Sequence, residues 1–350
     1  MPVHVQGLTA YPLSAASARV RIGDFRPFLR EQGVELSHRS ALTDAEYAVL
    51  RSHASPLQKA AVLVRSAARA AREQRTDSLL LVQRLLLLNP MPGIDPPTHV
   101  DAYDIDDALF VGSPAEANRR FQWVKQERRR SLATMRRARL VIAANAFLAD
   151  HARTLNRHVE VVPSCVDPTA QPLREHTDTD VVTIGWIGSH TTVAYLRPVL
   201  PVLASLGDHG RAAKLVVIGG DTGVRAPWIE HRPWSLQRQA VDLADLDIGI
   251  MPLPDSPWAR GKSGYKLLQY FAAGVPAVAS PVGINPELVA EGRGLVASST
   301  DEWTRGLLSL ARSADERRER GALGRSYVEA NFSYQRWAPE LAALLRSLAG

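Results

Sequence analysis

Short apolar runs alternate with longer amphipathic stretches along most of the chain. The runs are rich in Val, Ile and Leu and end at turn residues, which is typical of buried strands. The predicted strands are Val3–Leu8, Leu79–Val82, Thr98–Tyr103, Leu140–Ala144, Val159–Val162, Val181–Ile187, Lys214–Ile218, Ile248–Met251 and Ala277–Ser280. The main predicted helices are Arg19–Gln32, Ser55–Glu73, Ala115–Arg137, Thr192–Leu206, Gly264–Ala273 and Thr300–Ala311. This alternation predicts an α/β fold with parallel sheets flanked by helices.

A proline-rich segment without apolar periodicity, Pro163–Asp180, separates the two halves. It has the composition of a linker, so we predict a Rossmann-like N-terminal domain at 1–172 and a Rossmann-like C-terminal domain at 173–333. The last helix, 334–350, has an apolar stripe suited to packing back on the N-terminal domain. Doubly wound sheets bind ligands beyond the carboxyl ends of their strands, so the strand-to-helix loops are the places to look for a site.

The composition is that of a soluble globular protein of 350 residues, with 45% hydrophobic and 22% charged residues. The single cysteine, Cys165, excludes a disulfide scaffold and a Cys-rich zinc module. The N-terminus lacks a basic region followed by an apolar stretch, and the longest apolar run, Leu79–Leu88, is too short to span a bilayer. We therefore expect a cytoplasmic protein.

The net charge of +6 comes entirely from residues 1–172, which carry 23 Lys and Arg against 17 Asp and Glu. Nine of these basic residues lie in Glu116–Arg139, beside two acidic ones. The segment suits either a solvated helix face or a surface for anionic lipid or an acidic acceptor, which would place the protein peripherally at the inner face of the membrane. Only Phe121 and Trp123 interleave with the arginines, so we expect no nucleic-acid partner.

A glycine-containing loop precedes the predicted helix Gly264–Ala273. Gly261 and Gly264 allow close approach of backbone N–H groups to a ligand, and Lys262 and Lys266 add positive charge. These features suit an anionic phosphate group, although the spacing is not that of a Walker A loop. An ordinary helix with surface lysines is the alternative.

A second loop, Gly188-Ser189-His190-Thr191, follows the predicted strand Val181–Ile187. Its hydroxyl groups either cap the next helix or donate to a phosphate or sugar. The loop lacks the dinucleotide-binding fingerprint, which argues against a nicotinamide enzyme.

Two polar clusters mark the N-terminal half. Asp104, Asp106 and Asp107 follow a predicted strand and suit an acceptor's hydroxyl groups, a metal ion or a capped turn. Ser17 and Arg19 lie in the first strand-to-helix connection and suit an acceptor, a donor phosphate or a helix cap. Of these alternatives we expect acceptor binding at both clusters and no metal site.

With these motifs the chain resembles the retaining glycosyltransferases of family four, the glycosyl transferases group 1. The resemblance rests first on Arg260–Ser280, whose G-K-x-G-x-K pattern is similar to that of a variant branch of the family. It also rests on five further segments that follow the family's order along the chain: 102–110, 138–150, 161–167, 244–252 and 281–287. It implies the GT-B fold, in which two Rossmann-like domains face a central cleft. It also implies transfer of a hexosyl-like unit, with retention, from a nucleotide diphosphate sugar to a glycan, lipid-linked or small-molecule acceptor.

The chain also departs from the family's pattern. Gly261 and Gln269 stand where the family usually has two glutamates, and the Gly188–Thr192 loop lacks the family's usual cations. The resemblance then leaves Lys262 to stabilise the leaving group, assisted by Ser263, Gly264 and Lys266, while Gly283, Asn285 and Glu287 line the sugar pocket. No protein nucleophile, tightly bound cofactor or metal is expected. A catalytically silent nucleotide-sugar-binding protein and a nucleotide-sugar 2-epimerase are the alternatives.

Overall fold

The computed structural model describes residues 2–112 and 125–350 and divides into two compact units. Unit 1 contains the chain up to Cys165, the short segment Gly261–Ser263 and the C-terminal Tyr334–Gly350. Unit 2 contains Val166–Arg260 and Gly264–Ser333. The change of unit after Cys165 lies slightly before the domain boundary expected at residue 172.

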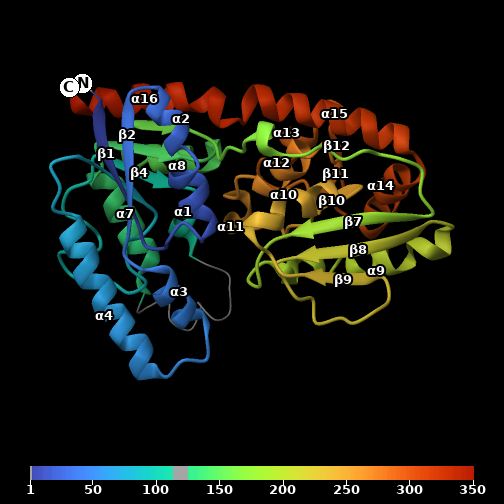
Figure 1. Cartoon of the computed structure of the whole chain (residues 1–350), viewed down its shortest axis with the longest axis horizontal. Coiled ribbons are helices and arrows are strands. Elements are labelled where there is room, and N and C mark those ends of the chain that lie inside the picture. The colour runs from blue at the N-terminus through green and yellow to red at the C-terminus, as the bar shows by residue number, and fades with distance from the viewer. Residues whose placement is uncertain (1, 113–124) are drawn as a thin grey trace. The chain divides into compact units, whose positions relative to one another are not determined.

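Unit 1, in which Figure 1 labels β1, β2 and β4, is built on a six-stranded parallel sheet with the order β2-β1-β3-β4-β5-β6. The central strands are buried on both faces, which explains their continuous apolar sequence. One strand, β2, was not predicted, because only two of its seven residues, Val34 and Leu36, are apolar. The strands are β1 Val3–Thr9, β2 Val34–Ser40, β3 Leu79–Gln83, β4 Ala102–Ile105, β5 Leu140–Ala143 and β6 Val159–Val161.

The helices of unit 1 pack on both sides of this sheet. The predicted helix Arg19–Gln32 is interrupted: a short α1 leads into a π-helical turn at Arg19–Gly23, and α2 follows it. The C-terminal helix α16 packs against α2, β1 and β2. Described helices of unit 1 are α1 Ala16–Ala18, α2 Arg26–Glu31, α3 Asp44–Arg51, α4 Pro56–Glu73, α7 Glu127–Arg137, α8 Ala146–Arg153 and α16 Tyr334–Ala349, with a 3-10 turn at Leu109–Val111.

Unit 2 has its own six-stranded parallel sheet, with the order β12-β11-β10-β7-β8-β9. The two edge strands, β9 and β12, were not predicted, because they are short and only partly buried. The strands are β7 Val181–Ile187, β8 Ala212–Ile218, β9 Ile229–Arg232, β10 Ile248–Met251, β11 Ala277–Ala279 and β12 Gly294–Val296.

Prolines reshape one predicted helix of unit 2. Thr192–Leu206 forms a 3-10 turn at Val193–Leu196 and a separate α9, because Pro198 and Pro201 lack the N–H groups that a continuous helix needs. The helices of unit 2 are α9 Leu200–Ser205, α10 Leu236–Ala244, α11 Pro257–Arg260, α12 Tyr265–Ala272, α13 Asn285–Val289, α14 Thr300–Arg312 and α15 Ala314–Asn331.

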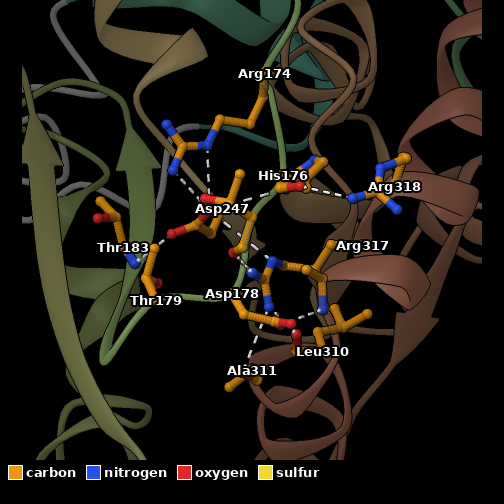
Figure 2. A network of polar contacts seen from close by, with 12 residues as sticks. Arg174, His176, Asp178, Thr179, Thr183, Asp247, Leu310, Ala311, Arg317 and Arg318 are labelled. Atoms are coloured by element: carbon orange, nitrogen blue, oxygen red, sulfur yellow. Dashed lines mark hydrogen bonds and ion pairs between the residues drawn. The ribbon is translucent and has the colours of Figure 1, made fainter.

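A polar network fixes the linker to unit 2 at the amino end of β10 (Figure 2). Asp247, directly before β10, pairs with Arg174 at 2.9 Å and accepts a hydrogen bond from the Thr183 N–H. His176 and the fully buried Arg317 lie 3.8 and 3.9 Å from the same carboxylate. We call Arg174, His176, Thr183, Asp247 and Arg317 the amino-edge network. Because of it, much of the predicted linker is an ordered part of unit 2.

Candidate functional site

The carboxyl ends of β3 and β4 bring polar residues together in unit 1. Arg84 directly follows β3 and has a left-handed backbone (φ 60°), which is uncommon for a residue other than glycine. Its N–H donates to the carbonyl of Asp104 in β4, at 2.9 Å. The turn therefore places the guanidinium of Arg84 beside the aspartates that follow β4.

Arg84 is the centre of this cluster. Its Nη2 lies 3.0 Å from Oδ2 of Asp107, and its Nε lies 3.5 Å from Oδ1 of Asp106. Its Nη1 donates to the hydroxyl of Ser17 at 3.2 Å, and Gln83 Nε2 donates to Asp106 at 3.0 Å. Two predicted groups of acceptor residues, one after β1 and one after β4, thus meet at an arginine that the sequence analysis did not select.

Lys262 belongs to the same cluster, because residues 261–263 fold into unit 1. Its Nζ donates to Oδ1 of Asp107 at 2.8 Å. Asn145, which caps α8 through the Leu148 N–H, holds the loop by donating to the carbonyls of Gly261 and Lys262. The sequence analysis assigned Lys262 to the donor and Asp107 to the acceptor, and the structure places them in contact. The carboxyl-edge cluster comprises Ser17, Gln83, Arg84, Asp106, Asp107 and Lys262.

Burial and neighbouring charges shift the pKa values of the two aspartates of the cluster in opposite directions. Burial raises the pKa of Asp106 to about 6, against the attraction of Arg84. Burial also disfavours the charge on Asp107, but Lys262 and Arg84 outweigh it and lower the pKa of that carboxyl. The pKa of Asp107 is thus lowered and that of Asp106 is raised, so Asp106 is the carboxyl of the pair that takes up a proton more readily.

The structure gives Asp104 and Arg19, two residues expected to bind the acceptor, contacts within unit 1. Asp104 is buried, and both of its carboxylate oxygens accept from Arg21, which also donates to the Val162 carbonyl. Arg19 is 5% exposed and lies 3.8 Å from Asp24. These contacts tie the π-helical turn to β4 and to Asp24, and acceptor binding by Asp104 and Arg19 stays a prediction.

The cations around the aspartates also bear on metal binding. Asp104 faces Arg21, Asp106 faces Arg84, and Asp107 faces both Arg84 and Lys262. Within residues 2–112 and 125–350, no group of three or more His, Cys, Asp or Glu side chains is arranged to hold a metal ion.

In unit 2 the loop Gly188–Thr191, which the sequence predicts to bind a phosphate or a sugar, follows β7. Gly188 has no room for a side chain, since a Cβ there would lie 2.4 Å from the ring of Trp186 and 2.6 Å from Nζ of Lys266. Lys266 Nζ stands 4.6 Å from the centre of the Trp186 ring. The structure thus brings Lys266 from α12 to the loop after β7.

The rest of this loop exposes polar groups. The hydroxyls of Ser189 and Thr191 lie 2.7 Å apart, and His190 is exposed. Thr192 does not cap the following 3-10 turn with its side chain, although its hydroxyl accepts from the Ser189 N–H at 3.3 Å. Helix capping, the alternative role for these hydroxyls, is therefore not their role in this structure.

Three further predicted donor residues lie around α12 and α13. Gly264, at the start of α12, and Gly283 both have left-handed backbones, and a Cβ on Gly283 would lie 2.7 Å from the carbonyl of Arg260. Asn285 is 1% exposed, and its Nδ2 donates to the Ser280 carbonyl. Among the described residues its buried Oδ1 has no hydrogen-bond partner, which leaves one acceptor available to a ligand.

The remaining predicted residues have simpler surroundings. Glu287 is exposed and lies 3.5 Å from the Tyr327 hydroxyl. Ser263 accepts from the Ser164 hydroxyl at 3.2 Å within unit 1. At Gly261 a Cβ would lie 2.6 Å from Cβ of Ala108, so this position leaves no room for the glutamate that the family usually has.

The basic segment Glu116–Arg139 is only partly described, because residues 113–124 lie outside the described residues. In the described part, Arg130 is 1% exposed and pairs with Asp95 at 2.7 Å. Arg128, Arg129, Arg136, Arg137 and Arg139 are exposed. The expectation of a basic surface is thus corrected for Arg130, which is a core residue.

Comparison with known proteins bears on the fold of the whole chain and on the relatives of its second half. The profile described as "Glycosyl transferases group 1" matches residues 178–313. No curated protein matches the sequence significantly. Along the described residues, no helix has both the length and the apolar character needed to cross a membrane.

Solved structures align over nearly the whole chain. Sucrose-phosphate synthase from Thermosynechococcus elongatus has a TM-score of 0.73 at 14% identity, with 99% of each chain covered. WaaG, a glycosyltransferase involved in lipopolysaccharide biosynthesis, has a TM-score of 0.63 at 15% identity, covering 97% of this chain and 98% of its own. HepE of Anabaena, in complex with UDP and glucose, has a TM-score of 0.62 at 12% identity and covers 98% and 99%. The predicted GT-B fold, two six-stranded parallel sheets with flanking helices, is confirmed.

Proposed function

We propose that this chain, whose residues 178–313 match the glycosyl transferases group 1 profile, transfers a hexosyl unit from a nucleotide diphosphate sugar to an acceptor hydroxyl with retention of configuration. The family match over the donor-side residues is the observation that carries the proposal. The acceptor class, whether glycan, lipid-linked or small molecule, stays open. A UDP-sugar is the first donor to test, since HepE is described in complex with UDP-glucose.

The donor is assigned to unit 2. Lys266, held beside Gly188 and over Trp186, supplies positive charge next to a loop of exposed hydroxyls and N–H groups. Such a combination suits a diphosphate. The unsatisfied Oδ1 of Asn285 suits a donor hydroxyl of the sugar. Lys262 is proposed to stabilise the negative charge of the leaving group, and its ion pair with Asp107 holds the ammonium group in place.

The acceptor is assigned to the carboxyl-edge cluster. Asp106 is proposed to accept a hydrogen bond from the acceptor hydroxyl, because its pKa of about 6 leaves it mainly ionised at neutral pH. The bond from the anomeric carbon to the diphosphate oxygen breaks, and the acceptor oxygen bonds to that carbon from the same face. The proton of the acceptor hydroxyl passes to the departing diphosphate oxygen. Electrostatic stabilisation and orientation then supply the rate enhancement, and no protein nucleophile is used.

A thermal-shift screen with UDP, GDP, TDP and ADP tests the donor site, because a bound ligand raises the apparent stability. Gly188→Ala should abolish the shift, since the added Cβ overlaps the Trp186 ring and the Lys266 ammonium group, and its melting temperature without nucleotide shows whether the variant is folded. Gly207→Ala is the matched control, because a Cβ there meets nothing within 4 Å. If no nucleotide shifts the wild-type protein, the proposed donor site is wrong.

Turnover separates the alternatives. Nucleotide release that requires an acceptor supports a transferase, whereas formation of an epimeric nucleotide sugar without acceptor indicates a 2-epimerase. Binding without any turnover, across a panel of acceptors, indicates a silent nucleotide-sugar-binding protein.

A further inference from the structure

An exposed apolar stripe runs along α4 in unit 1. Leu57 and Val64 are 82% and 66% exposed, the highest values among the large hydrophobic side chains in the described part of the chain. Ala61 and Ala68 are exposed as well, and all four fall on one face because they are spaced by three or four residues. We call Leu57, Ala61, Val64 and Ala68 the α4 stripe.

The stripe is not the face by which α4 packs on its own unit. The buried residues of the helix are Val62, Ser66, Ala67 and Ala70, on the opposite side. Figure 1 shows α4 at the margin of unit 1. A helix with apolar residues on both its inner and outer faces presents surface that is normally covered by a partner.

Cations border the stripe. The side chains of Arg65 and Arg72 are 57% and 75% exposed and follow Val64 and Ala68 on the neighbouring face. Arg72 pairs with Glu73, which is the only acid within α4, all of whose residues are described, and Arg65 pairs with Glu46 of α3. The side chains of these two acids are only 15% and 10% exposed, so the arginines are the more accessible partners. The outer face of α4 therefore combines apolar and positively charged groups.

We propose that the α4 stripe, with its border of Arg65 and Arg72, is the surface by which this protein docks on an anionic phospholipid membrane. The helix would lie in the interface plane, with Leu57 and Val64 inserted shallowly and the arginines at the phosphate groups. Charge complementarity favours this partner over a second copy of the chain, because two copies would bring their arginine rows together. The net charge of +6, all from the N-terminal half, also favours binding to an anionic membrane.

Vesicle co-sedimentation of the full chain tests the apolar part. We expect binding to phosphatidylcholine vesicles that contain phosphatidylglycerol, and little binding to phosphatidylcholine alone. Leu57→Asp with Val64→Asp should lower the partition coefficient at least ~10-fold, since two apolar side chains no longer enter the interface. Leu236→Asp with Val241→Asp on α10, where both residues are about half exposed, is the matched control and should bind normally.

Charge removal tests the border. Arg65→Gln with Arg72→Gln should weaken binding by roughly five-fold per residue, and salt should weaken the wild type as the Debye length shortens from ~10 Å at 0.1 M to ~3 Å at 1 M. Arg157→Gln with Arg305→Gln removes the same charge from exposed positions elsewhere and should have a smaller effect. Circular dichroism and a thermal melt establish that each variant is folded.

A fluorescent label reports whether the stripe itself enters the lipid. Cys165 is fully buried, so an environment-sensitive dye on Leu57→Cys is selective. Its emission should shift to shorter wavelengths with anionic vesicles, and the same dye on Leu236→Cys should not respond. Equal pelleting with neutral vesicles, or unchanged pelleting of the Leu57→Asp, Val64→Asp variant, would overturn the proposal. So would a wild-type dimer that this double substitution dissociates, because the occupant would then be a second copy.

Discussion

The amino-edge network of unit 2 and the carboxyl-edge cluster of unit 1 both contain arginine–aspartate pairs, yet most of their charged side chains differ in burial. Asp247, His176 and Arg317 have side chains at most 2% exposed. In the cluster, Arg84, Lys262, Asp106 and Asp107 are 12–23% exposed. Both sheets are parallel, and the two groups of charges lie at opposite ends of their strands. The amino-edge network lies before β10, whereas the carboxyl-edge cluster lies after β3 and β4.

This contrast distinguishes a stabilising from a ligand-binding arrangement of charges. At the amino edge, backbone groups complete the network: Thr183 donates to Asp247, and Arg317 donates to the carbonyls of Leu310 and Thr177. At the carboxyl edge the charged groups bond chiefly to one another and keep accessible surface. Ligands of doubly wound sheets bind at that edge, so groups left partly open there are the better candidates for function.

The largest expected effect is on the stability of unit 2. Asp247→Asn should lower the free energy of unfolding by about 3 kcal/mol or more, because it leaves the buried Arg317 and the partly buried Arg174 without their counter-charge. Urea unfolding followed by tryptophan fluorescence measures the loss. Asp221→Asn, in an exposed pair with Arg225, is the control and should leave the transition midpoint in place. A midpoint in Asp247→Asn equal to that of the control would contradict the assigned role.

The same carboxylate gives stability a pH dependence. Burial alone would raise the pKa of Asp247, but the hydrogen bonds from His176 and the Thr183 N–H and the charge of Arg174 outweigh burial and lower the pKa from its ordinary 3.8 to about 2. Because folding lowers this pKa, the ionised carboxylate stabilises the folded protein at pH values above about 4. This contribution to the free energy of unfolding should be lost as the pH falls from about 4 towards 2. Asp247→Asn should flatten that part of the stability curve.

At the carboxyl edge, Lys262→Ala should weaken nucleotide diphosphate binding and reduce transfer at least ~10-fold, because a charge-assisted phosphate contact contributes roughly 1.5–3 kcal/mol. Lys262→Arg should restore only part of the rate, since its planar fork differs from a point charge. Asp107→Asn keeps the Lys262 ammonium group and removes the carboxylate that pairs with it. This variant therefore separates the effect of losing the positive charge from the effect of losing the ion pair. Unchanged binding and turnover in Lys262→Ala would remove Lys262 from the site.

A smaller effect is expected from Asp106→Asn, about five-fold on kcat/KM for the acceptor, which corresponds to one hydrogen bond of about 1 kcal/mol. In the wild type, kcat/KM should rise with pH through about 6, because the ionised carboxylate is the form that accepts from the acceptor hydroxyl. The variant should lose this acidic limb, and an exposed control, Asp150→Asn, should keep it. An acidic limb that persists in Asp106→Asn would assign it to another group.

The smallest expected effect is that of chelation. Asp104, Asp106 and Asp107 face arginine and lysine, so we predict transfer that does not depend on a metal ion. The rate should be the same after exhaustive treatment with EDTA. If EDTA stops transfer and Mn²⁺ or Mg²⁺ restores it, the assignment of Asp106 and Asp107 to the acceptor is wrong.

Local sequence determined most of the fold. Strands such as β3, β5 and β10 are buried on both faces, so their continuous apolar runs are visible without any partner. The edge strands β9 and β12 and the half-polar β2 depend on neighbours for their pairing, and the sequence did not reveal them. Helix α4 begins at Pro56, next to the predicted start at Ser55, and the structure shows a capping box there.

The sequence also identified separate pieces of the candidate site, because polar residues after a buried strand stand out against it. It did not identify their partners. Gln83 and Arg84 read as a break in the apolar run Leu79–Leu88, and only the pairing of β3 with β4 places Arg84 beside Asp106 and Asp107. Lys262 and Asp107 are 155 residues apart. Backbone periodicity is a local property, whereas the partner of a charge depends on which strand ends the fold brings together, so the tertiary structure alone decided these contacts.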